Sequence, residues 1–130
     1  MNTFFLTVSL VSLGLNELLK KGIALKALQE SEAVREALLM EGFLKELGKN
    51  TGLAAYGIEE VKQAVQARAV KELLVSQKAF LENRTMLEPL MLAVEKANAS
   101  VHVFMSQGQA LEQLEGFGGL AALLRYKTSF

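Results

Sequence analysis

The sequence contains no cysteine, no tryptophan and no aspartate, and it has a single histidine, His102, and a single proline, Pro89. Without cysteine there is no disulfide, no thiolate nucleophile and no zinc or iron–sulfur site built on sulfur. Without aspartate a Ser-His-Asp arrangement cannot form, and a Ser-His-Glu version or a closed metal site would depend on His102. We therefore expect no metal, no cofactor and no catalysis, but a non-enzymatic domain.

An excess of charge of either sign is also absent, because 14 lysines and arginines balance 14 acidic residues. A chain with zero net charge has no overall field that would attract nucleic acid or an anionic membrane. Its 130 residues, 51% of them hydrophobic, are enough to bury the core of one globular domain.

The first apolar run, residues 4–11, could be a secretory signal or a β-strand. The positively charged start of a signal is missing, since the first lysine is Lys20, and a membrane span needs about 20 apolar residues. The β-branched and aromatic residues favour a strand. A short helix is expected next over Asn16–Lys21, ended by Gly22.

A long helix is predicted over residues 25–47, where apolar residues recur every three or four positions. The expected core-facing residues are Ala37, Met40, Leu44 and Leu47. Glu36 falls on the other side of this helix with further charged residues, and residues 48–52 have the composition of a turn. This helix is expected to be the longest element of the chain.

After this turn, short apolar runs alternate with helical patterns, which is typical of a layered α/β domain. The expected order is a strand at 53–56, a helix from Ile58, a buried parallel strand at 73–75, a loose polar segment at 77–85, a helix with Pro89 in its first turn, a strand at 101–105, a helix at 110–114 and a last strand at 120–126. Four methionines are expected to fill the core, namely Met40, Met86, Met91 and Met105.

Two features could carry chemistry, His102 and the glycine cluster at 116–119. His102 could be a general base, but it lies between valines in a strand and no acid is near it in the sequence. A structural histidine is the preferred interpretation. The glycines could cradle a phosphate, but they precede a strand rather than a helix, so we interpret them as a tight turn.

Three motifs give the sequence a family resemblance. The run Gly116–Tyr126 is similar to the closing Gly-Gly-Ile-Ala-Ala-Ile-Leu-Arg-Tyr motif of the Pelota family and the related archaeal and eukaryotic class-1 release factors. Residues 52–57 and 69–76 resemble the Tyr-Gly, Ala-Val and Leu-Leu-Val-Ser blocks of that family, and residues 14–22 resemble a segment that ends the central domain of Pelota. The motif positions, expected to be structural, are Tyr56, Gly57, Ala69, Val70, Gly118, Gly119, Arg125 and Tyr126.

The resemblance implies an α/β fold in which a mixed sheet is sandwiched between helices, as in the ribosomal proteins that bind kink-turn RNA. It implies that residues 1–22 are the strand and helix remnant of a preceding central domain, and that residues 23–130 form the C-terminal domain. It further implies a cytoplasmic, non-catalytic adaptor for ribosome rescue that docks an elongation-factor-type GTPase and an ABC-class recycling ATPase. The partner-contacting residues are not identified.

Some positions depart from the family pattern. Arg68 replaces a glycine, which argues against a tight helix end there and predicts an exposed charge. Gln77 replaces an acid, and the loop 106–109 is short. An archaeal release factor remains an alternative parent for this domain.

A small RNA-binding domain of the same fold is the other alternative. Its kink-turn-binding members carry Gly-Asn-Glu after the first strand, whereas this chain has Gly57, Ile58 and Glu59. An isoleucine cannot make hydrogen bonds to base edges, so we do not expect direct RNA binding.

Overall fold

The computed structural model describes residues 15–128 of the chain, so the strand expected at 4–11 lies outside the described residues. Two compact units divide the chain between Val34 and Arg35, and each is described by itself. In the first unit the described residues form the beginning of helix α2 (Leu15–Lys49), on which Ile23 and Val34 expose large apolar side chains. In the second unit lie the rest of α2 and all the other described elements.

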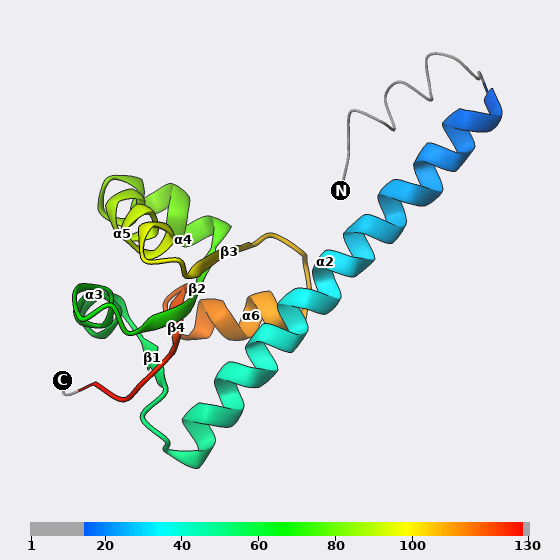
Figure 1. Cartoon of the computed structure of the whole chain (residues 1–130). Coiled ribbons are helices and arrows are strands. Elements are labelled where there is room, and N and C mark those ends of the chain that lie inside the picture. Colours follow the sequence, from blue (N-terminus) through cyan, green and yellow to red (C-terminus); the bar gives the residue numbers. More distant parts are fainter. Residues whose placement is uncertain (1–14, 129–130) are drawn as a thin grey trace. The chain divides into compact units, whose positions relative to one another are not determined.

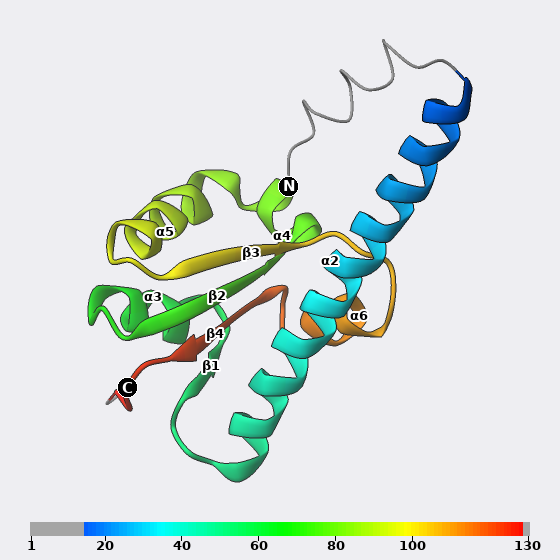
Figure 2. The same cartoon turned by 45° about the vertical axis from the view of Figure 1, so that its right-hand side comes forward.

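The second unit alternates strands and helices, as the sequence predicts. The elements after α2 are β1 (Ala54–Tyr56), α3 (Ile58–Gln66), β2 (Val70–Ser76), α4 (Gln77–Glu82), α5 (Arg84–Lys96), β3 (Ser100–Phe104), α6 (Gln109–Gly116) and β4 (Leu120–Leu124). The four strands form one sheet in the order β1-β4-β2-β3 (Figure 2). β2 and β3 are parallel, and β4 is antiparallel to both β1 and β2. The expectation of a mixed sheet is confirmed.

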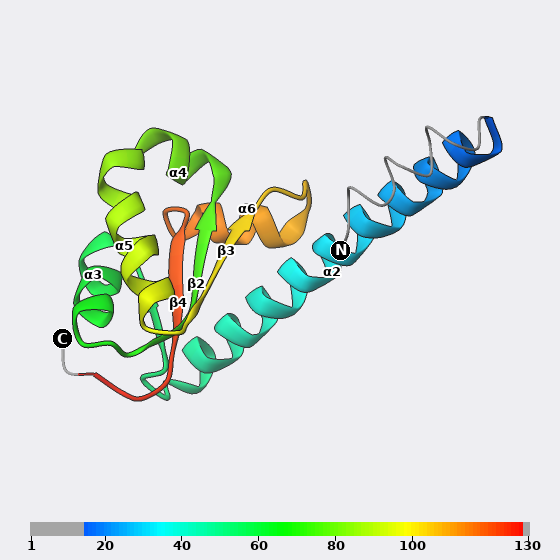
Figure 3. The ribbon, with the colours of Figure 1, turned by 45° about the horizontal axis from the view of Figure 1, so that its top comes forward.

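Helices cover both faces of this sheet. Figures 1 and 3 show α3, α4 and α5 on one side of the strands and α6 on the other. The first face packs a core against α3, α4 and α5 that includes Val61, Leu73 and Val94. The second face packs Leu74 and Phe104 against α6 and the part of α2 that follows Arg35. Because side chains alternate along a strand, β2 contributes neighbouring residues to both cores.

Four helices end in the same hydrogen-bonded turn. At the end of α3, the N–H of Arg68 donates to the carbonyl of Val65 and the N–H of Ala69 donates to that of Ala64, both at 3.0 Å. This pair of bonds is a Schellman motif, which requires a left-handed residue after the helix. The left-handed residues of the four turns are Asn50, Arg68, Asn98 and Gly118. The predicted loss of a tight end at Arg68 is therefore wrong, while its predicted exposure is confirmed.

The glycine cluster forms the turn between α6 and β4, as predicted. Gly119 has a φ of +80°, and a Cβ placed on it would lie 2.6 Å from the Cβ of Ala79 and 2.6 Å from the Oγ of Ser76. Ser76 is buried and caps α4, because its Oγ accepts a hydrogen bond from the N–H of Ala79. The missing side chain of Gly119 therefore lets the turn reach the start of α4.

Several predicted boundaries are wrong. Gly22 does not end a helix, since α2 continues through it to Lys49. The segment 77–85, expected to be loose, forms α4 and the start of α5. Pro89 consequently lies inside α5 rather than in its first turn. The last strand ends at Leu124, two residues earlier than predicted.

Some predicted faces are also wrong. Met86 and Met105 are 46% and 50% exposed rather than buried in the core. On α2 the buried side includes Glu36, which is 2% exposed, whereas Ala37 is exposed. No helix within residues 15–128 combines the length and the apolar character needed to cross a membrane.

Candidate functional site

The motif residues near the chain's end form a clasp at the end of β4. The N–H of Arg125 donates to the carbonyl of Ala69 at 2.6 Å, and its guanidinium donates to the carbonyls of Val70 at 3.2 Å and Ala97 at 2.9 Å. The hydroxyl of Tyr126 donates to the carbonyl of Ala67. Ala67 and Ala97 are the C-terminal caps of α3 and α5, so this clasp supplies donors to carbonyls that their helices leave without partners.

The other motif residues meet at the opposite end of β4. The N–H of Gly57, which follows β1, donates to the carbonyl of Leu120 at 3.1 Å. Tyr56 pairs with Ala121 in the sheet, and Gly118 lies in the turn just before β4. The motif positions predicted from the sequence thus gather in two groups, with the five residues of β4 between them.

Two aromatic rings make up what we call the aromatic surface, Tyr56 and Phe117. Their centroids are 4.9 Å apart with an interplanar angle of 61°. Phe117 also packs edge-on against Phe43 of α2, at 5.2 Å and 80°. Tyr56 is 42% exposed, and Phe117 is half-buried. Sequence reasoning did not select Phe117, although an aromatic residue between glycines of a turn was a signal for it.

An apolar pocket with a volume of about 310 Å³ opens beside the start of α3. It is lined by Gly57, Ile58, Ala79, Asn83, Met86, Leu87, Gly118 and Leu120. Asn83 is the only lining residue with a hydrogen-bonding side chain, and its Nδ2 already donates to the carbonyl of Ala79 at 3.2 Å. Since base recognition needs polar groups that reach base edges, this pocket suits an apolar side chain better than a nucleobase.

His102 has an acidic neighbour that its sequence position does not reveal. Its Nε2 lies 3.5 Å from Oε1 of Glu72 on the adjacent strand. Because the register pairs Glu72 with Ser100 and Leu74 with His102, the two side chains are diagonal neighbours on one face. Nε2 is buried and makes no hydrogen bond with any described residue. The structural interpretation of His102 remains a prediction, and no group of three potential metal ligands exists within residues 15–128.

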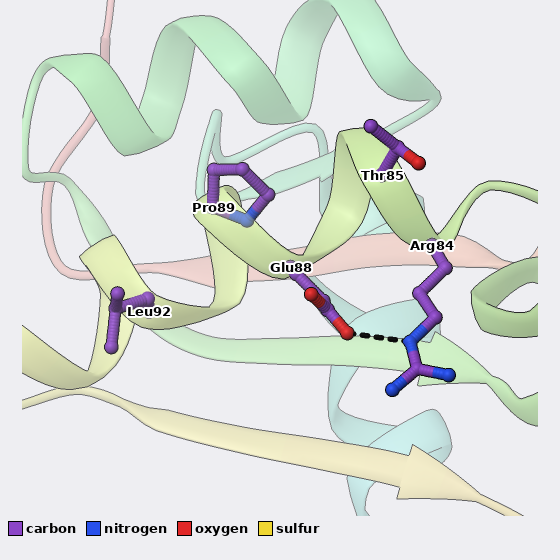
Figure 4. A pocket seen from close by; sticks show the side chains of 5 residues that line it. All are labelled: Arg84, Thr85, Glu88, Pro89 and Leu92. Atoms are coloured by element: carbon purple, nitrogen blue, oxygen red, sulfur yellow. Dashed lines mark hydrogen bonds and ion pairs between the residues drawn. The ribbon is translucent and has the colours of Figure 1, made fainter.

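A second hollow, of about 500 Å³, lies along α5 and is shown in Figure 4. There the side chains of Arg84 and Glu88 point toward each other, and Arg84 Nε donates to Glu88 Oε1 at 2.6 Å. This hydrogen bond, together with the charge of Glu88, raises the pKa of Arg84 above its ordinary value. Pro89 leaves the carbonyl of Thr85 without its helical donor, but Thr85 is exposed to water. The hollow is therefore a feature of an exposed, proline-containing helix.

Comparison with known proteins gives a consistent result. A family model described as eRF1 domain 3 matches residues 33–128. A protein pelota homolog from Methanococcus maripaludis strain C7 is 40% identical over 113 residues, which cover 87% of this chain and 32% of that relative. The chain thus spans about a third of the length of this curated relative.

Solved structures also resemble this one. A model of ribosome-bound archaeal Pelota and ABCE1 superposes with a TM-score of 0.79 and 35% identity, covering 91% of this chain and 33% of that chain. Dom34 of S. cerevisiae, described as a translation termination-like factor involved in RNA quality control pathways and interacting with Hbs1, has a TM-score of 0.73 and 28% identity. That match covers 88% of this chain and 33% of Dom34.

Proposed function

We propose, on the premise that this chain belongs to the eRF1 domain 3 family and is similar to Pelota proteins, that it is a non-catalytic interaction domain of a ribosome rescue factor. In this role it docks a translational GTPase of the elongation-factor type and the ABC-class recycling ATPase on stalled ribosomes in the cytoplasm. The related archaeal Pelota is seen with ABCE1 on the ribosome, and Dom34 is described as interacting with Hbs1. The division into residues 1–22 and 23–130 belongs to the same proposal.

The observation that carries the docking role is the aromatic surface. Aromatic side chains are enriched among the residues that dominate binding energy at protein interfaces. Tyr56 is 42% exposed and its ring packs edge-on against Phe117, which itself packs on Phe43, so contacts within the domain position the pair. Rigid aromatic groups lose little conformational entropy on binding. We infer that the GTPase contacts this surface and that the neighbouring apolar pocket receives one of its apolar side chains.

The clasp has a different place in this proposal. The side chains of Arg125 and Tyr126 donate hydrogen bonds to backbone carbonyls of their own domain. Their role is therefore to hold the ends of α3 and α5 together, and the motif positions at the other end of β4 are those available to a partner.

Isothermal titration calorimetry with a GTP-loaded, elongation-factor-type GTPase from Methanococcus maripaludis tests the proposal. The 130-residue chain is expected to bind, and the Tyr56→Ala variant is expected to bind at least about tenfold more weakly, as for a residue at an interface hot spot. Leu92→Ala is the matched control, because Leu92 is also an exposed apolar residue but lies on α5. Thermal unfolding of both variants separates lost binding from lost folding.

Two results would contradict the proposal. The first is no binding by this chain under conditions where full-length Pelota binds the GTPase. The second is an equal loss of affinity in the Tyr56→Ala and Leu92→Ala variants. Binding to kink-turn RNA with a steep dependence on salt would favour the RNA-binding alternative.

A further inference from the structure

A buried carboxylate joins α2 to the loop between β3 and α6. Glu36 is 2% exposed. Its Oε2 accepts a hydrogen bond from the N–H of Met105 at 3.1 Å and one from the hydroxyl of Ser106 at 3.4 Å, while its Oε1 accepts one from the N–H of Ser106 at 3.2 Å. The helix residue and the loop residues are about 70 positions apart in the sequence. This cluster of bonds is the long-range polar link between the two elements.

Breaking these hydrogen bonds is unfavourable for both the helix and the loop. Among the described side chains no lysine or arginine forms an ion pair with Glu36. The two peptide N–H groups and the hydroxyl therefore supply the hydrogen bonds that this buried group needs, and burial without them would be strongly unfavourable. The same N–H groups belong to consecutive loop residues and would lose their partners too. Helix and loop consequently hold each other in place.

The loop leads directly into α6, and α6 is held again at its other end. Phe117, just after α6, packs on Phe43 of α2 with a centroid distance of 5.2 Å. Glu36 and Phe43 are two helical turns apart and so lie on one side of α2, separated by about 10 Å. The eight residues of α6 span about 12 Å. The segment from the loop to Phe117 is thus joined to α2 at two places, before and after α6.

We propose that Glu36 is a carboxylate latch that positions α6 and, through it, Phe117 in the aromatic surface. Glu36 is a positioning residue, because its buried carboxylate has no route to a partner. Opening the latch frees the start of α6, so that Phe117 is held by its ring contacts and by the backbone turn after α6 alone. The part of this inference that concerns partner binding rests on the proposed function, whereas the part that concerns the loop does not.

The Glu36→Gln substitution tests the latch, because it keeps the size of the side chain but replaces an acceptor oxygen by an NH₂ group. That group would face a peptide N–H, so at least one donor loses its partner. In the full chain, hydrogen exchange of the Met105 and Ser106 amides measured by NMR is expected to become about ten- to a hundredfold faster. Glu41→Gln is the matched control, since Glu41 is an exposed acid of the same helix, and it should leave both amides unchanged.

A milder variant covers the case in which Glu36→Gln does not fold. Ser106→Ala removes only the hydroxyl bond to Glu36 Oε2. It is expected to raise exchange at the Met105 and Ser106 amides by about two- to fivefold. The amide of Leu74 in the central strand β2 serves as an internal reference for global unfolding. Unchanged exchange at Met105 and Ser106 in either variant would overturn the latch.

Binding of the same archaeal GTPase tests the positioning role. Glu36→Gln is expected to weaken binding by about three- to tenfold, while Val94→Ala, which loses stability in the other core, should bind as the unmodified chain does. Faster exchange with unchanged affinity would overturn the positioning of Phe117. Failure of the unmodified chain to bind would overturn the proposed function, and exchange at Met105 and Ser106 would still decide whether Glu36 is a latch.

Discussion

Substitutions of Arg68 test whether its left-handed backbone conformation at the end of α3 is strained. Arg68 has a φ of +56°, and the left-handed conformation costs a residue with a side chain about 1–2 kcal/mol relative to glycine. Glycine gains about 0.4–1 kcal/mol of freedom in the unfolded chain, which offsets part of that difference. Removing the positive charge of Arg68 from the C-terminal end of α3 also lowers stability, because that charge interacts favourably with the helix dipole. The informative comparison is therefore between Arg68→Gly and Arg68→Ala, since both variants lack this charge. The glycine variant should be more stable by about 0.5–1 kcal/mol.

At the neighbouring position, Ala67, glycine should have the opposite effect on stability, so a substitution there serves as the control. Ala67 has a φ of −82° and lies in the right-handed region. Ala67→Gly should therefore lower the free energy of unfolding by about 0.5–1 kcal/mol. Urea unfolding followed by circular dichroism gives the midpoints. If the Arg68→Gly variant were no more stable than Arg68→Ala, the strain argument for this turn would be refuted.

Four further predictions concern stability and are checked by the same urea unfolding. Gly119→Ala should lower the free energy of unfolding by more than about 2 kcal/mol, because a clash with the start of α4 adds to the backbone strain. Gly118 also has a positive φ, +86°, but a Cβ placed on it would meet no atom within 4 Å. Gly118→Ala should therefore lower the free energy of unfolding only by the backbone strain, about 1–2 kcal/mol. Tyr126→Phe should lose about 0.5–1.5 kcal/mol, the value of one hydrogen bond to Ala67, and a neutral result would mean that water replaces it. Phe104→Ala should lose about 3–5 kcal/mol, since the ring is fully buried.

Much of the strand pattern could be predicted, but helix ends could not. Runs such as residues 73–75 and 101–105 are apolar or β-branched in a way that suits a covered sheet, and both coincide with strands, except that Met105 follows the end of β3. Gly22, by contrast, lies between two lysines and the apolar residues 23–25, and no turn there needs a left-handed residue, so α2 continues through it. Arg68 and Asn98 end helices because the alanines that follow them, Ala69 and Ala99, pack at the sheet. That tertiary packing is not visible in a local pattern.

The family could be predicted from the sequence, since the match to eRF1 domain 3 confirms the resemblance built on three motifs. The polar contacts between distant parts of the chain could not be predicted. Glu36 was expected on the solvent side of its helix, and its partners lie about 70 residues away in a loop. The pair of His102 and Glu72 depends on the register of two strands. A single sequence specifies neither a register nor which loop lies above a helix.

The position of β4 also bears on how the domain folds. β4 is the last of the described strands, yet it lies between β1 and β2, and within residues 15–128 β1 has no other strand partner. Among the described strands, β1 is therefore unpaired until β4 is in place, and β2 is joined to β3 alone. Closing the sheet therefore requires contacts between distant parts of the chain, which slows folding. Refolding kinetics should consequently be limited by the pairing of one five-residue strand, whose Ala121 and Ala122 are buried on opposite faces of the sheet.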